Sequence, residues 1–460
     1  MSVYISHAGA SGPGLAAPQA ASGPSRAAAP AVRAAATPRR RAARTYLVIA
    51  AMLAPLCVPA GPGQTAALDF VNLFAIAAFF LLVVGPGRAP LRAPLLAPIA
   101  FVAVGSLIAC AWAPSLSLAA LALAQDAYLY VWFLVVVNLV RTRHDVRAVR
   151  VAWVWTAVAV SLGAVGQLLV HTGGSLGTLL GSKGMRPAAS LYNPNMLADY
   201  LVMSLFTALS LGAEMRRLPL AFAVATIGLG LLATKSNGGM IACAVGALVW
   251  CVVAVATGPS RRHRGFLAAA AIVASLAGLG AWLNAEWGVG DGLLHALKEH
   301  TFAGRMEHSG ESRMRIWDQL ERTYAHSPLG IGPGNSGSLT LGIAERERPD
   351  SYRSKEAHSD YLAFAIERGP LGLLGLAGLT LAGFLAVARY WQGARRDNGA
   401  TPRRAGLWTA SMAAVLAASA MHSTVIEKLH FRHFWLFLAL VCASALAGPE
   451  RAAAPVAEAA

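Results

Sequence analysis

The sequence predicts an all-α, polytopic inner-membrane protein of about 12 transmembrane helices with one large, partly helical loop on the outer face. Of its 460 residues, 56% are hydrophobic and 13% are charged, a composition that is rare in soluble domains. Apolar stretches long enough to cross a hydrocarbon core of roughly 30 Å recur along most of the chain. We expect helices, because a helix of about 20 residues spans such a core with its backbone groups satisfied.

Twelve apolar segments are separated by polar or helix-breaking residues, and we expect each to cross the membrane once. They are 45–61, 66–84, 93–112, 116–140, 148–171, 194–213, 218–234, 238–257, 265–284, 359–390, 405–422 and 432–448. Residues 1–44, rich in Ala, Pro, Ser and Gly, and residues 449–460 are expected to be cytoplasmic tails, the first of them disordered. This division gives membrane helices 1–9 in 45–284, an outer loop in 285–358 and helices 10–12 in 359–448.

The distribution of arginines supports this topology. With the N-terminus inside, short inner loops hold clusters such as Arg141 to Arg150, Arg261 to Arg264 and Arg395 to Arg404, while short outer loops hold few basic residues. The net charge of +16 therefore indicates membrane orientation, and we expect no nucleic-acid partner. All five cysteines lie in apolar segments, so neither a disulfide framework nor a zinc site is expected.

The outer loop 285–358 is patterned enough to fold. Residues 311–326 are expected to form a helix with Trp317, Leu320 and Tyr324 along one face and Pro328 beyond its end. A Gly-rich turn follows over 328–335, which we interpret as structural because no strand and no Gly-Lys-Ser/Thr accompany it. The next segment is broken at Gly369-Pro370, and this break places His358 near the outer surface.

Two loop residues are candidates for chemistry. His358 lies where a polar loop meets the membrane, and it is a candidate general base; the alternative is an interfacial histidine with ordinary hydrogen bonds. Arg315 has Glu311 four residues earlier, whereas Arg313 has no acidic partner at that spacing. Arg313 is therefore either a solvated arginine or a ligand that grips phosphate with its guanidinium fork.

Two positions in outer segments, and one inside the fourth apolar segment, leave alternatives open. Arg186 and Lys235 occupy outer segments that are otherwise poor in basic residues, so each either reaches the interface or faces a shared anionic ligand beside Arg313. Asp126 is either a proton-relay group or a buried acid bonded to Tyr128 or a neighbouring helix. The spacing of His422, Glu427, His430 and His433 fits no familiar metal site, and we expect none.

Several motifs together resemble the O-antigen ligase and polymerase family of bacterial surface-polysaccharide enzymes. The run Arg186 to Asn195 resembles the family's arginine followed by a small-residue turn and Asn-Pro-Asn. Residues 313–317 and the turn 328–335 resemble its loop signature. Most specifically, His358-Ser359, nine residues and Gly369-x-x-Gly372 match the ligase pattern of His with Asn, Ser or Gln, nine residues and Gly-x-x-Gly.

This resemblance implies a cofactor-free, metal-independent glycosyltransferase whose active site faces the periplasm, with both termini cytoplasmic. The implied partners are membrane lipids, an undecaprenyl-diphosphate-linked glycan donor, and lipid A core or a growing glycan as acceptor. His358 would be the base, and Arg313, Lys235 and Arg186 would bind the diphosphate. Ser359, Asn195, Arg315 and Glu367 are candidates for supporting roles.

One position departs from the family. Members often have Ser-Arg-Gly where this chain reads Ser236-Asn237-Gly238, so Lys235 is assigned the second diphosphate contact with Arg186 as the other candidate. An O-antigen ligase-like transfer is the first expectation, followed by a polymerase of O-antigen, capsule or exopolysaccharide and then a protein O-oligosaccharyltransferase. A transporter or flippase is the alternative from another class, although polar residues near the expected midplane are sparse.

Overall fold

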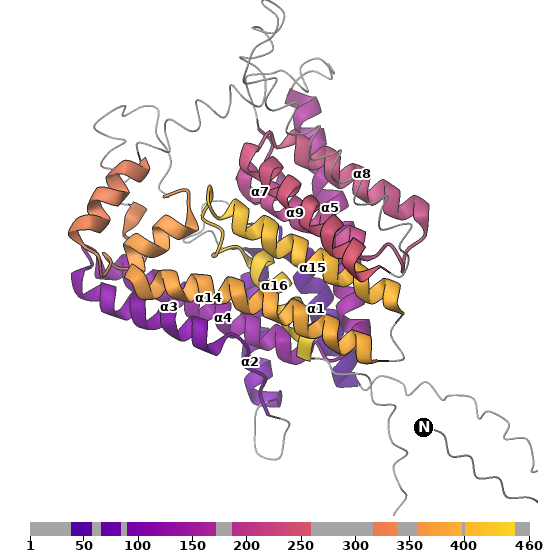
Figure 1. The fold of residues 1–460 in the computed structure, drawn as a ribbon, viewed down its shortest axis with the longest axis horizontal. Helices are drawn as coiled ribbons and strands as arrows, with labels where there is room; N and C mark the ends of the chain where they lie inside the picture. The colour runs from indigo at the N-terminus through magenta and orange to yellow at the C-terminus, as the bar shows by residue number, and fades with distance from the viewer. Residues whose placement is uncertain are drawn as a thin grey trace, which may run out of the picture.

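The computed structural model describes residues 38–57, 66–83, 90–171, 186–258, 316–337, 357–397 and 401–446. Within them the structure is helical, as the sequence predicts, and the nearest approach to a strand is an isolated bridge between Cys57 and Ala66. Figure 1 shows the long helices packed side by side. They are α1 (Pro38–Leu53), α2 (Ala67–Val83), α3 (Leu96–Ala109), α4 (Leu116–Leu139), α5 (Arg143–His171), α7 (Pro194–Ser210), α8 (Arg217–Ala233), α9 (Asn237–Thr257), α14 (Asp360–Arg396), α15 (Pro402–His422) and α16 (Arg432–Leu446).

These helices coincide with eleven of the twelve expected apolar segments, and the remaining segment, 265–284, lies outside the described residues. Among the described helices, four are long and apolar enough to cross a membrane, namely Leu116–Leu139, Arg143–His171, Asn237–Thr257 and Asp360–Arg396. Four shorter apolar helices accompany them, at Ala67–Leu81, Leu96–Trp112, Arg217–Ala233 and Arg432–Leu446. Helices of this length and composition are those of a membrane protein; the count of 12 crossings stays a prediction.

The first helix begins earlier than its apolar segment. It starts at Pro38, seven residues before the expected start, and so includes four arginines of the N-terminal basic cluster. Proline suits a first helical turn and arginine is a good helix former, so the helix extends beyond its apolar part. Arg44 then reaches α5, where its Nε lies 2.8 Å from Asp145 Oδ1.

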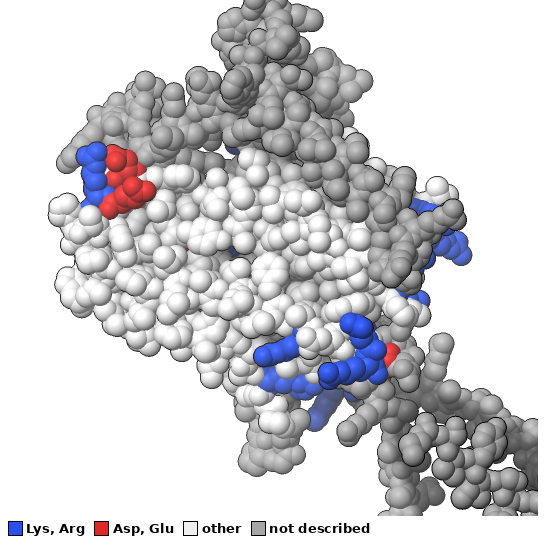
Figure 2. All heavy atoms as spheres, in the orientation of Figure 1, with Lys and Arg blue, Asp and Glu red and all other residues white. Residues whose placement is uncertain are grey.

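The described arginine clusters meet at one end of the helices, which we call the arginine end. Five contacts define it: Arg44 with Asp145, Arg92 N with Asn138 Oδ1, Arg143 with Asp397, and Arg150 with both Ser210 and Glu214. Figure 2 shows blue side chains gathered at the lower right, where α14 ends in Figure 1. When consecutive helices alternate in direction, every second loop lies at the same end. The predicted topology places the arginine clusters in such loops.

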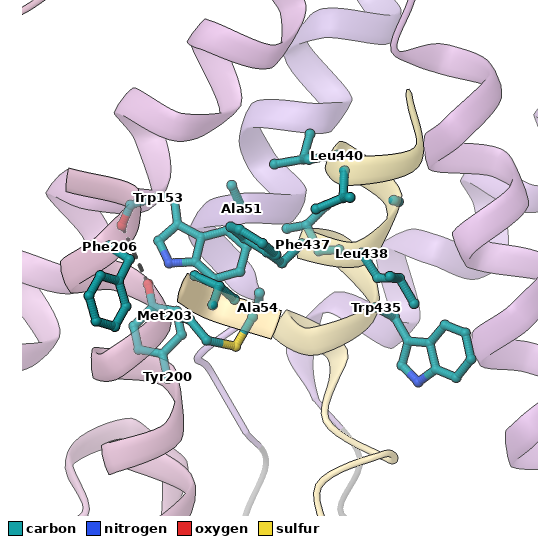
Figure 3. Packing of buried hydrophobic residues seen from close by; sticks show 14 of the residues in the cluster. Ala51, Ala54, Trp153, Tyr200, Met203, Phe206, Trp435, Phe437, Leu438 and Leu440 are labelled. Atoms are coloured by element: carbon teal, nitrogen blue, oxygen red, sulfur yellow. Dashed lines mark hydrogen bonds between the residues drawn. The ribbon is translucent and has the colours of Figure 1, made fainter. Parts of the chain in front are cut away.

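Large buried aromatic side chains fill the centre, where α5, α7, α15 and α16 meet (Figure 3). Trp153 stacks on Tyr200 with ring centroids 5.7 Å apart, and Phe437 packs edge-on against both Trp153 and Trp408. Buried aromatic pairs of this kind stabilise a core beyond their simple burial. They hold α7 and α16 together, and both of these helices begin beside the candidate site.

The described part of the predicted loop packs on α14. Residues 316–326 are helical and end before Pro328, and Ile316, Leu320 and Trp317 contact the start of α14. In the following turn Gly330, Gly332 and Gly334 all have positive φ, and the Asn335 side chain bonds both backbone groups of Ser115. These contacts agree with the interpretation of this turn as structural.

The predicted break in the tenth apolar segment is confirmed. Gly369 has φ 65° and ψ −164° inside α14, immediately before Pro370. A Cβ atom at Gly369 would lie 2.6 Å from the Leu329 carbonyl oxygen, so the Gly-rich turn fits against this kink. The kink thus joins α14 to the loop that precedes it.

Candidate active site

Three helices begin in the same manner at the end opposite the arginine end. We call it the His358 end. A residue in the left-handed region precedes a polar N-cap in each: Tyr192 before Asn193 at α7, Lys235 before Ser236 at α9, and His358 before Ser359 at α14. Non-glycine residues adopt this conformation rarely and at a cost, and such residues are enriched at functional sites. Two of the three, Lys235 and His358, are predicted site residues.

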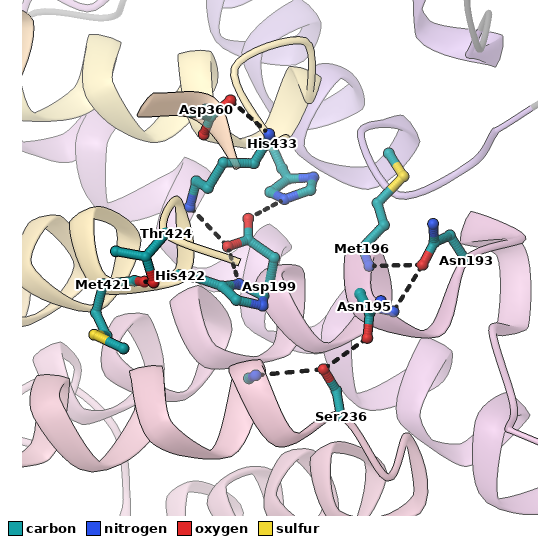
Figure 4. A network of polar contacts seen from close by, with 12 residues as sticks. Asn193, Asn195, Met196, Asp199, Ser236, Asp360, Met421, His422, Thr424 and His433 are labelled. Atoms are coloured by element: carbon teal, nitrogen blue, oxygen red, sulfur yellow. Dashed lines mark hydrogen bonds and ion pairs between the residues drawn. The ribbon is translucent and has the colours of Figure 1, made fainter. Parts of the chain in front are cut away.

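Arg186 and Asn195 are connected to the turn that carries Lys235. The Arg186 guanidinium donates to the Thr234 carbonyl oxygen at 3.1 Å and to Asn195 Oδ1 at 2.7 Å. Ser236 Oγ donates to the same Asn195 oxygen at 2.9 Å, as Figure 4 shows. The structure thus brings three predicted residues from two segments, Arg186, Asn195 and Lys235, to one place.

His358 is held between backbone contacts on both sides. The indole of Trp317 donates to the Ala357 carbonyl oxygen at 3.1 Å. On the other side, Ser359 Oγ and the Asp360 amide both donate to the Ser423 carbonyl oxygen, at 3.4 and 2.9 Å. Ser359 also caps α14, so its predicted supporting position is built into the start of the helix.

The turn at residues 422–425 links the His358 and Lys235 segments. A Cβ atom at Gly238, in the first turn of α9, would lie 2.7 Å from the Val425 side chain and 3.3 Å from the His422 ring. Ser423 in the same turn accepts the hydrogen bonds from the start of α14. The imidazole-bearing and ammonium-bearing segments therefore pack on one common turn.

A buried carboxylate holds the loop that contains this turn. Asp199 of α7 contacts His422 Nδ1 at 2.8 Å, Lys428 Nζ at 2.7 Å and His433 Nε2 at 2.9 Å (Figure 4). The side chains of Asp199 and Lys428 are 2% and 0% exposed, so the ion pair is desolvated and depends on its hydrogen bonds. The backbone amides of Lys428 and Leu429 in turn donate to Asp360 Oδ1.

A cavity of about 220 Å³ lies beside the first turns of α14. Its polar lining includes Asp126, Asp360, Glu367, Arg368 and Glu427, and Phe364 and Leu429 contribute apolar surface. Asp360, Phe364 and Glu367 share one face of α14, which begins two residues after His358. A space of this size holds about one sugar ring, whose hydroxyl groups bond to carboxylates.

Arg368 pairs with Asp126 inside this cavity. Its Nη1 donates to Asp126 Oδ2 and, at 2.9 Å, to Ser106 Oγ, and the guanidinium lies 4.5 Å from the centre of the Phe364 ring. Asp126 is therefore bonded to a neighbouring helix, as one interpretation predicts, but its side chain is 40% exposed and not buried as expected. The Tyr128 hydroxyl does not bond Asp126; it donates a hydrogen bond to Asp69 Oδ1 at 2.6 Å.

Glu367 connects α14 to the Gly-rich turn. Its Oε1 accepts hydrogen bonds from Ser336 Oγ at 2.6 Å and from the Ser336 amide at 3.2 Å. The predicted supporting residue thus fixes the wall of the cavity. Nearby His430 has its pKa lowered to about 3 by burial and by the neighbouring Arg432 charge, so its ring is neutral at physiological pH.

Residues 222–377 match the family model described as O-antigen ligase. This segment, about a third of the chain, is similar to the O-antigen ligase family. The match includes Lys235, the Gly-rich turn, His358 and the kink at Gly369, while Arg186 and Asn195 precede it. It supports glycosyl transfer of the O-antigen ligase or polymerase type as the general class of activity. No curated protein matches the chain.

Two predicted site residues, Arg313 and Arg315, lie outside the described residues. Their roles stay predictions. Conversely, sequence reasoning did not single out Asp199, Lys428 or Arg368. The available signal was that each is a charged residue in or beside an apolar segment, where a charge needs a partner.

Proposed function

We propose that this protein transfers a glycan from undecaprenyl diphosphate to an acceptor hydroxyl, that of the lipid A core, at the periplasmic face of the bacterial inner membrane. The observation that carries the proposal is the packing of the Lys235 turn, with Arg186 attached, and the His358 segment on residues 422–425. A cationic group and an imidazole at one end of the helices suit a diphosphate donor and a hydroxyl acceptor.

In this proposal the donor diphosphate binds between Arg186 and Lys235, with Arg313 as a third ligand. The starts of α7 and α9 lie beside these residues, and helix N-termini favour anions. As the bond between the sugar and the diphosphate oxygen breaks, negative charge grows on the leaving group. Fixed cations stabilise that charge in the transition state, so the reaction proceeds without a metal ion.

His358 acts as the general base. Its imidazole removes the proton from the acceptor hydroxyl, the freed oxygen attacks the anomeric carbon, and undecaprenyl diphosphate leaves. The cavity beside α14 supplies the space for the acceptor sugar, where carboxylates of Asp126 and Glu427 accept hydrogen bonds from hydroxyl groups. In this proposal the left-handed backbone of His358, together with the bonds that Trp317 and Ser423 make to its neighbours in the chain, orients the imidazole for this role.

The proposed topology has 12 crossings with the arginine end in the cytoplasm. Arginine-rich loops favour the cytoplasmic side, and the contacts between helix ends group the described clusters at one end. The opposite His358 end then faces the periplasm, where no nucleotide is at hand and a lipid diphosphate supplies the activated sugar.

The decisive experiment uses purified full-length protein, an undecaprenyl-diphosphate-linked glycan and lipid A core, with the product resolved by gel electrophoresis. We expect His358→Ala to lower the transfer rate by at least about 100-fold, as expected for a general base. His326→Ala is the matched control, because His326 is exposed and bonds only its own helix at Arg322 among the described residues. Full activity of the His358 variant would overturn the proposal.

The product separates the alternatives. Transfer to lipid A core identifies a ligase, elongation of the lipid-linked glycan identifies a polymerase, and transfer to a protein hydroxyl identifies a protein O-oligosaccharyltransferase. In cells, a donor that accumulates on the inner leaflet when the protein is removed would instead indicate a flippase.

A further inference from the structure

A second cavity, of about 280 Å³, lies at the arginine end, far along the helices from the candidate active site. Its lining includes Arg143, Arg147, Arg150 and Arg404, with Tyr390 and Trp408 as aromatic walls. The residues come from α5, α14, α15 and α16 and from Glu214, which follows α7. Nothing in the proposed glycan transfer uses this cavity.

The cavity carries an excess of positive charge. Arg147 and Arg150 share one carboxylate, Glu214, at 2.9 and 3.0 Å, and Arg143 pairs with Asp397. Arg404, exposed on the first turn of α15, adds a further positive charge. Four arginines thus face two carboxylates, and like charges held this close repel each other unless an anion lies between them.

Arg150 is built into the cavity wall. It is 5% exposed, its two terminal nitrogens bond Ser210 and Glu214, and its guanidinium lies 4.7 Å from the centre of the Trp408 ring. Its Nε is buried and has no acceptor among the described residues. A buried donor left without an acceptor costs free energy, and an anion in the cavity offers one.

The start of α15 adds a further site for an anion. Its N-cap Thr401 makes no side-chain capping bond, and the first turn contains no acidic residue but two arginines, Arg403 and Arg404. Positive side chains at the positive end of a helix dipole are unfavourable by themselves. A phosphate group would satisfy both the arginines and the helix end.

We propose that this cavity binds the phosphate group of an anionic phospholipid. Phosphate is the shared chemistry of lipid headgroups and soluble anions, and the position favours the lipid. Of the two candidate spans that meet here, α5 begins at this cavity and α14 ends at it. The cavity therefore lies at the depth of the headgroups of one leaflet. Its apolar walls, including Val146, Tyr390 and Trp408, suit the glycerol and upper acyl chains.

Native mass spectrometry of the full-length protein, released from micelles with phosphatidylglycerol and phosphatidylcholine, tests this site. The wild-type protein is expected to prefer phosphatidylglycerol. The double variant Arg147→Gln/Arg404→Gln, which spares the buried Arg150, should weaken phosphatidylglycerol binding by about tenfold or more. Arg216→Gln/Arg217→Gln removes the same charge from exposed residues near the same end that do not line the cavity, and should keep the wild-type affinity.

Three results would overturn the proposal. One is equal binding of the two lipids by the wild-type protein. Another is the same loss of affinity in both double variants, which would assign the effect to general surface charge. The third is binding of inorganic phosphate as tight as that of phosphatidylglycerol, which would assign the cavity to a soluble anion. Both double variants should elute from size-exclusion chromatography as the wild-type protein does, which shows that they are folded.

Discussion

Lys235 and His358 share one backbone conformation, with φ of 51° and 55°, each one residue before a serine that caps a helix. In both cases the serine cap fixes the helix start, and the left-handed residue comes immediately before it. The left-handed conformation costs a β-carbon-bearing residue roughly 1 kcal/mol or more. The fold therefore accepts strain at two positions whose side chains the proposed reaction needs.

This strain predicts an unusual order of stability among His358 variants. His358→Gly and His358→Ala both remove the imidazole, and both should lose glycan transfer. Glycine adopts positive φ without steric cost, so the glycine variant should be more stable than the alanine variant by about 1 kcal/mol. Thermal unfolding of the two purified variants measures the difference, and an alanine variant of equal or higher stability would contradict the assigned conformation.

The proposed diphosphate contacts predict a selective effect on donor binding. Lys235→Ala and Arg186→Ala should each raise the KM for the lipid-linked donor by roughly tenfold, which corresponds to about 1.4 kcal/mol. The KM for the acceptor should stay within about twofold. Arg216→Ala, an exposed arginine at the other end of the helices, is the matched control. An equal rise in both KM values would point to a general loss of structure.

The buried Asp199–Lys428 pair predicts strong coupling. Asp199→Asn leaves the 0%-exposed Lys428 ammonium without its charge partner, and the loss of stability should be about 3–5 kcal/mol. Lys428→Met in the Asp199→Asn background removes the unpaired charge and should restore much of that loss. A double-mutant cycle of thermal unfolding measures the coupling. Additive effects would mean that the two groups do not interact in the native protein.

The apolar pattern was sufficient to locate helices, because membrane-length helices leave long unbroken apolar stretches in the sequence. The break at Gly369-Pro370 and the end of the loop helix before Pro328 were also predicted, since proline acts locally. The early start of α1 was not predicted, because the apolar pattern detects only the apolar part of the helix, and Arg39 to Arg41 extend it towards the N-terminus.

The arrangement of the site depends on contacts that a single sequence does not reveal. Asp199 and Lys428 lie 229 residues apart, and Arg368 and Asp126 lie 242 residues apart. Asp126 stands out in the sequence as an acid in an apolar segment, but its partner does not. Both pairs form only where α7 meets the 423–431 loop and where α4 meets α14. The resemblance to a family identified His358 and Lys235, whereas the common turn at residues 422–425 required the structure.

The kink of α14 predicts a contrast between two glycines. Gly369→Ala would place a Cβ 2.6 Å from the Leu329 carbonyl oxygen at φ 65°, so we expect a loss of about 1–3 kcal/mol and a displaced Gly-rich turn. Gly393→Ala, in the same helix, meets no atom within 4 Å and should be neutral or slightly stabilising. Thermal unfolding compares them, and similar values for both variants would contradict the packing of the turn against the kink.

His430 predicts a pH dependence of stability. Its pKa is lowered to about 3 by burial and by the charges of Arg432 and His433, whereas an unfolded chain has a histidine pKa near 6.5. Between these values the unfolded chain binds a proton that the folded protein does not, so stability falls as the pH is lowered from about 6.5 towards 3. Because His430 is half-buried, the free energy of unfolding should change with pH by less than about 1.4 kcal/mol per pH unit, the slope of a fully buried group. Thermal unfolding from pH 7 to pH 4 should show a shallower decline in His430→Gln than in the wild-type protein, because glutamine does not titrate. Parallel curves would show that folding does not lower the pKa of His430.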